Sequence, residues 1–106
     1  MNHIEKKDYY NFLYAYYQNL LTDKQRKIFE SYYFDDYSLS EIANSEEVSR
    51  NAIWDILKKV EHNLDEYESK LHLLEQDKKK TAYLNQLENH LDEEGKEILK
   101  KIKEME

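Results

Sequence analysis

Apolar residues recur at alternating intervals of four and three along the second half of the chain. They are Ile53, Leu57, Val60, Leu64, Tyr67, Leu71 and Leu74. This spacing places them on one edge of an α-helix, as at the a and d positions of a heptad repeat. No glycine or proline interrupts the pattern before Asp77. The spacing therefore predicts one helix from Ser49 to Gln76, about 40 Å long at about 1.5 Å per residue.

An apolar edge of this length must be covered by other apolar side chains. A short helical headpiece would cover only the N-terminal half of the helix. Either a second copy of the chain or the C-terminal helices, folding back, could cover the rest. We favour a homodimer because the helices after Gly95 are short, although fold-back remains the alternative. The residues of this dimer or packing seam are Leu57, Val60, Leu64, Tyr67, Leu71 and Leu74.

The remainder of the chain also predicts helices, so the expected fold class is all-α. There is no proline and one glycine among 106 residues, which leaves few helix breakers. A first helix is expected over residues 6–20, and Thr22 with Gln25 forms a capping box for a second. We expect residues 1–60 to form a helix-turn-helix headpiece. Residues 61–106 would form a helical stalk and C-terminal helices, continuous with the headpiece in one folding unit.

Two short helices joined by a tight turn are predicted between Ser38 and Leu57. Ser38 and Glu41 form another capping box, and Ser49 is placed to cap the following helix. This arrangement is typical of nucleic-acid readers, whose second helix contacts bases. The candidate nucleic-acid-binding residues are Ser49, Arg50, Asn51, Trp54 and Lys58.

Arg50 could bind guanine or phosphate, Asn51 could bind adenine, and the Ser49 hydroxyl could contact phosphate. The alternative is that Ser49 is only a helix cap and Arg50 only a solvated charge.

The net charge argues against ordinary DNA binding. The formal net charge is −7, whereas phosphate contacts dominate DNA affinity and favour basic domains. The predicted recognition helix has only a small local excess of cations, from Arg50, Lys58 and Lys59 against Asp55. RNA binding by residues 78–80 and exposed tyrosines is a weaker alternative. An acidic helical dimer that binds a basic protein partner, without nucleic acid, also stays open.

Several other functions lack the residues they require. The chain has no cysteine, and its four histidines form no HxxxH pair, so no metal site is expected. No glycine-rich loop is present to hold a phosphate-bearing cofactor, so we expect neither a cofactor nor an enzyme. No apolar run approaches the roughly 20 residues that span a bilayer, and no signal peptide is evident. We therefore expect a cytoplasmic protein without a membrane partner.

Residues 6–75 carry a recognisable pattern, which is most specific in the helix-turn-helix. Its segments are Leu21-Thr22, Lys24-Gln25-Arg26, Tyr32-Tyr33, Asp36-Tyr37-Ser38-Leu39, Glu41-Ile42-Ala43, Val48-Ser49-Arg50, Ala52 and Asp55. This pattern resembles the YlxM family of small bacterial helix-turn-helix proteins, which are similar to region 4 of sigma factors. The resemblance implies a DNA-binding or regulatory protein linked to the signal recognition particle pathway. DNA and components of that particle are the partners it implies.

Two residues depart from the usual helix-turn-helix pattern. Glu46 stands where an apolar core residue is usual, and Glu47 where glycine or asparagine serves a turn that needs positive φ. Glu46 is therefore expected to leave a gap in the core, and Glu47 to strain the turn. We therefore expect a non-enzymatic regulatory or accessory protein whose helix-turn-helix could bind DNA, and the YlxM resemblance implies its link to the signal recognition particle pathway.

Overall fold

The computed structural model describes residues 2–105, and all regular secondary structure within them is helical. This confirms the predicted all-α fold class. The chain divides into two compact units, Met1–His72 and Leu73–Glu106. The boundary expected between residues 60 and 61 falls inside a helix, and the units instead divide where that helix ends.

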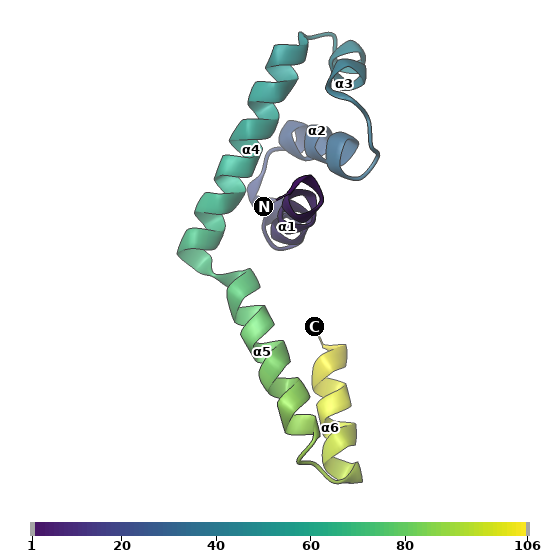
Figure 1. The fold of residues 1–106 in the computed structure, drawn as a ribbon, viewed down its shortest axis with the longest axis vertical. Helices are drawn as coiled ribbons and strands as arrows, with labels where there is room; N and C mark the ends of the chain where they lie inside the picture. The colour runs from purple at the N-terminus through teal and green to yellow at the C-terminus, as the bar shows by residue number, and fades with distance from the viewer. Residues whose placement is uncertain (1, 106) are drawn as a thin grey trace. The chain divides into compact units, whose positions relative to one another are not determined.

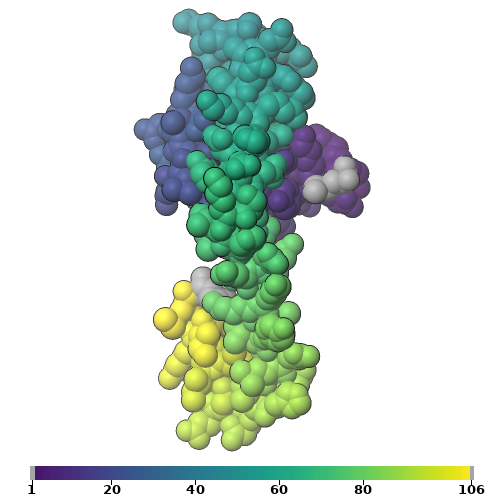
Figure 2. Space-filling view, turned by 90° about the vertical axis from the view of Figure 1, so that its left-hand side faces the viewer, coloured from purple at the N-terminus to yellow at the C-terminus, as the bar shows by residue number. Residues whose placement is uncertain are grey.

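The first unit contains four α-helices and one short 3-10 helix within the described residues. In order they are α1 (His3–Tyr17), η1 (Gln18–Leu20), α2 (Asp23–Tyr33), α3 (Leu39–Glu46) and α4 (Arg50–Leu71). Helices α1, α2 and α3 all contact α4, and α3 lies near the N-terminal end of α4 (Figure 1). In Figure 2, α1 (purple) and α2 (blue) emerge on either side of α4. Helix α4 is therefore the element on which this unit is assembled.

Helix starts follow the capping signals in the sequence. Thr22 and Ser38 each accept a hydrogen bond from the backbone N–H three residues later, as predicted, and both capping boxes are complete. Ser49 likewise caps α4 by accepting from the N–H of Ala52. Helix α1 begins three residues earlier than predicted because Asn2 and Glu5 form a further capping box.

The core of the first unit lies between α4 and the helices that contact it. Its fully buried side chains include Leu13 and Tyr17 from α1, and Ile28 and Phe29 from α2. The Phe29 ring stacks on two tyrosine rings, at centroid distances of 4.4 Å to Tyr14 and 4.2 Å to Tyr33. Four aromatic residues of α1 and α2 therefore fill much of the core, whereas Phe12 of α1 is 56% exposed.

Within the first unit, the chain covers most of the predicted seam itself. Leu57, Val60 and Leu64 are buried against the helical core. Tyr67 is half-buried; its hydroxyl donates to the Leu20 carbonyl at 3.3 Å, and its ring lies 5.9 Å from that of Tyr17. Leu64 is therefore a packing residue of the headpiece and is not available to a second copy.

The predicted single helix from Ser49 to Gln76 is wrong in its last turn. Helix α4 ends at Leu71, because His72 adopts a left-handed conformation with φ 56° while its N–H donates to the Glu68 carbonyl. Histidine enters this region more readily than most residues, so the chain stops a helix here without glycine or proline. Leu74 lies in the next helix, α5 (Leu73–Glu88), and Leu71 is 48% exposed, so the seam is not continuous.

The second unit is a pair of helices, α5 and α6 (Glu93–Glu104), that lie side by side (Figure 1). Asp92 caps α6 by accepting from the Gly95 N–H, and Lys103 of α6 contacts Asn85 and Glu88 of α5 at 3.1 and 3.2 Å. Leu99 is buried. Several apolar side chains of this pair are exposed: Tyr83, Leu87, Ile98, Ile102 and Met105. Residues 83 and 87 are therefore not core positions of this helix pair.

Residues 78–80 lie inside α5. Glu75 and Lys79 form an ion pair at 3.1 Å across one turn, in the orientation that supports a helix. The three consecutive lysines therefore do not mark a helix end here.

Candidate nucleic-acid interface

The turn between α3 and α4 has helix-turn-helix geometry. Glu47 has φ 58° and ψ 42°, which confirms that this position needs a left-handed residue. Its N–H donates to Asn44 O, and the Val48 N–H donates to Ala43 O, which together form the Schellman arrangement. The chain thus reaches Ser49 in an extended conformation and begins α4 at Arg50.

Glu46 is partly buried and lines a pocket of ≈ 420 Å³ together with Lys27 and Ile42, so open space does remain beside it. Its side chain is 20% exposed and pairs with Lys27 of α2 at 3.0 Å. This ion pair connects α3 to α2 and offsets one of the two negative charges that the turn places beside α4.

The predicted nucleic-acid-binding residues fall on the exposed face of the first turns of α4. Arg50, Asn51 and Trp54 line one shallow depression, and all three are exposed. Ser49 is exposed as well, but its hydroxyl is used as the helix cap. Arg50 and Asn51 are therefore the polar residues of this set that can contact a base or a phosphate. The N-terminus of α4 lies beside them, and a helix N-terminus favours anions.

Lys58 lies one turn beyond Trp54 and contacts its ring. The ammonium nitrogen is 4.2 Å from the ring centroid, within the range of a cation–π interaction. The same nitrogen is 3.3 Å from Glu61 Oε1. Trp54 and Lys58 thus connect the exposed start of α4 with a deeper site farther along the helix.

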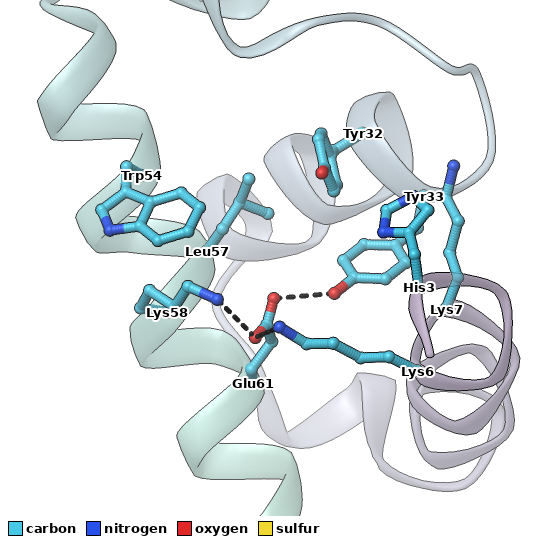
Figure 3. Close-up of a pocket in the computed structure, with 9 residues that line it drawn as sticks. All are labelled: His3, Lys6, Lys7, Tyr32, Tyr33, Trp54, Leu57, Lys58 and Glu61. Atoms are coloured by element: carbon cyan, nitrogen blue, oxygen red, sulfur yellow. Dashed lines mark hydrogen bonds and ion pairs between the residues drawn. The ribbon is translucent and has the colours of Figure 1, made fainter. Parts of the chain in front are cut away.

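That deeper site is organised by Glu61, a carboxylate that is only 7% exposed. Lys6 of α1 and Lys58 of α4 both lie 3.3 Å from its Oε1, and the Tyr33 hydroxyl donates to its Oε2 at 2.7 Å. Burial and the negative charge of Glu61 raise the pKa of Tyr33 well above its usual value, so this hydroxyl stays protonated and donates. Figure 3 shows the two lysines converging on Glu61 from opposite sides.

A pocket with a volume of ≈ 170 Å³ opens above these groups, and we call it the Glu61 pocket. Helix α1 contributes His3, Lys6 and Lys7, α2 contributes two tyrosines, and α4 supplies the wall from Trp54 to Glu61 (Figure 3). Its complete lining is His3, Lys6, Lys7, Tyr32, Tyr33, Trp54, Leu57, Lys58 and Glu61.

The sequence alone did not predict that Lys6, Tyr33 and Glu61 form one site. The available signal was Glu61 itself, because it lies four residues after Leu57 and three before Leu64. That spacing puts a carboxylate on the apolar face of α4, where a buried charge requires partners. The identity of those partners depends on how α1 and α2 pack, which periodicity does not reveal.

Residues 2–105 were also expected to hold neither a metal site nor a membrane span. No three His, Cys, Asp or Glu side chains of this segment are grouped as metal ligands would be. None of its helices has both the length and the apolar character needed to cross a bilayer.

Comparison with known proteins agrees with this architecture. A family model described as "Putative helix-turn-helix protein, YlxM / p13 like" matches residues 4–105. A UPF0122 protein of Geobacillus sp. strain WCH70 is 45% identical over 106 residues, covering 97% of this chain and 96% of the relative. One from Listeria monocytogenes serotype 4b strain F2365 is 44% identical over 105 residues, covering 93% and 96%. One from Halalkalibacterium halodurans is 47% identical over 85 residues, covering 80% and 78%.

These matches confirm the resemblance drawn from the helix-turn-helix residues and extend it through the second unit. The chain therefore belongs to the UPF0122 family of YlxM / p13-like helix-turn-helix proteins.

Proposed function

We propose that this protein is a non-enzymatic regulatory protein that binds duplex DNA through α3 and α4. The observation that carries the proposal is the exposed group of Arg50, Asn51 and Trp54 at the start of α4, directly after a left-handed turn. These side chains supply a guanidinium, an amide and an aromatic ring, the groups that read base edges and phosphates.

The acidic net charge is compatible with this proposal because the charges are unevenly distributed. The wall of α4 that follows Trp54 faces lysines from α1, and the Glu61 pocket has three lysines in its lining against one glutamate. The pairing of Glu46 with Lys27 reduces the repulsion beside the turn. Weak binding with a shallow salt dependence is therefore expected, since few phosphates are contacted.

The direct test is equilibrium binding to a randomised duplex pool at about 50 mM salt, where phosphate contacts are strong. Arg50→Ala should weaken binding by roughly fivefold or more, in line with about 1–3 kcal/mol for a base-reading arginine. Lys70→Ala is the matched control, because Lys70 is an exposed cation at the opposite end of α4 and should leave affinity unchanged. Absence of any binding by the parent protein at low salt would refute the proposal.

A second candidate function is protein binding, which the exposed apolar residues of α5 and α6 favour. Ile98 and Ile102 of α6, and Met105 at its C-cap, are all exposed and recur at intervals of four and three, so they share one face of the helix. An exposed apolar face commonly marks a protein interface. The YlxM resemblance suggests components of the signal recognition particle as partners in the cytoplasm, and a homodimer is the other option.

Two measurements distinguish these partners. Affinity capture detects binding to components of the signal recognition particle, and sedimentation detects a homodimer. Ile98→Glu should abolish either association, while Arg50→Ala should leave both intact. Capture of particle components by a monomeric parent would favour the accessory role. A dimeric parent that becomes monomeric with Ile98→Glu would favour self-association. A monomeric parent that captures no particle component would exclude both.

A further inference from the structure

The Glu61 pocket holds more positive charge than its own carboxylate neutralises. Lys6 and Lys58 approach the same oxygen of Glu61, each at 3.3 Å, so their ammonium nitrogens lie no more than twice that distance apart. Two like charges this close repel, and one carboxylate offsets only one of them. Each ammonium also has three donors, so both retain donors for another acceptor.

The rest of the lining does not reduce this excess. Lys7 lines the pocket and pairs at 2.9 Å with Asp36, an exposed residue outside the lining, and His3 lies beside it. Glu61 is the one acidic residue of the lining. An anion that enters would therefore meet ammonium groups from both α1 and α4, together with a half-exposed indole ring (Figure 3).

The volume limits the ligand to a small group. A pocket of ≈ 170 Å³ has room for about five waters at roughly 30 Å³ each, and it is smaller than the roughly 300 Å³ where drug-sized sites begin. A tetrahedral oxyanion with several acceptor oxygens fits this space and can accept from lysines on both sides. A nucleoside would not fit entirely inside.

We propose that the Glu61 pocket binds a phosphate group, with Lys6 and Lys58 as its principal donors. Trp54 lines both this pocket and the depression formed with Arg50 and Asn51. A backbone phosphate of a DNA duplex bound by α4 is therefore one source of the phosphate group. A site for that phosphate rests on the proposed function. A free phosphorylated small molecule is the other source.

Trp54 makes the test direct because it is the only tryptophan of the chain and its ring contacts the Lys58 ammonium. Titration with inorganic phosphate should change the tryptophan emission as Lys58 shifts toward the anion. Lys6→Gln should weaken phosphate binding by about fivefold or more, because it removes one of the two ammonium groups. The contact between Lys58 and the indole ring is left in place. Glu61→Gln should strengthen it, because the amide removes the competing negative charge while keeping an acceptor for Tyr33.

Lys70→Gln is the matched control and should leave phosphate affinity unchanged, with circular dichroism to verify the fold of each variant. Opposite effects of Lys6→Gln and Glu61→Gln distinguish a binding site from a merely structural role, which would lower binding in both. No emission response to phosphate, or a response that Lys6→Gln leaves unchanged, would overturn the proposal.

Duplex DNA distinguishes the two sources. If the pocket takes a backbone phosphate, Lys6→Gln lowers the slope of log affinity against log salt by about 1. If DNA binding is unaffected while inorganic phosphate binding is lost, the pocket serves a free phosphorylated molecule. Failure of the parent to bind any duplex would refute the proposed function, and the phosphate titration alone would then decide the inference.

Discussion

At the scale of single residues, two glutamates occupy positions that usually exclude them. Glu61 sits on the buried face of α4, where Lys6, Lys58 and Tyr33 satisfy its oxygens. Glu47 holds the left-handed position of the helix-turn-helix turn. The ion pairs and the hydrogen bond of Glu61 connect α1, α2 and α4 at one site. Glu47 strains the backbone, because a residue with a Cβ occupies a left-handed conformation.

The left-handed conformation of Glu47 leads to a stability prediction. Glu47→Gly should raise the free energy of unfolding by about 1 kcal/mol, because glycine adopts this conformation without a Cβ penalty. Urea unfolding followed by circular dichroism measures the change, and Glu41→Gly inside α3 is the contrasting variant that should destabilise. A loss of stability in Glu47→Gly would show that the turn is not strained.

At the scale of elements, α4 combines a core helix and a candidate recognition helix in 22 residues. Its start, its N-cap and its buried face could be predicted from the sequence, because Ser49 and the spacing of Ile53, Leu57, Val60 and Leu64 carry those signals. Its end could not, because His72 stops the helix without proline or glycine. The Glu61 site could not be assembled either, since it joins residues 55 positions apart in the chain.

The two leucines of the seam should respond differently to truncation. Leu64 is 0% exposed, so Leu64→Ala should cost about 2–5 kcal/mol of folding free energy through lost burial and an unfilled cavity. Leu71 is 48% exposed at the end of α4, and Leu71→Ala should cost less than about 0.5 kcal/mol. Chemical denaturation of both variants tests this. Equal losses would mean that a second copy covers Leu71 in solution.

At the scale of the whole molecule, a net charge of −7 conceals a local concentration of cations around α4 and α1. The family match spans residues 4–105, so the α5–α6 pair belongs to the family fold even though the sequence resemblance could be recognised only to about residue 75. The chain is best described as a helix-turn-helix headpiece followed by a pair of helices with exposed apolar residues.

The most direct test of the central claim is an amide chemical-shift map of the full chain titrated with a short duplex at low salt. If α4 contacts DNA, we expect chemical-shift changes concentrated at the start of α4, from Ser49 to Lys58, and extending to Lys6 of α1. Shifts confined to α5 and α6, or no shifts at any residue, would contradict it.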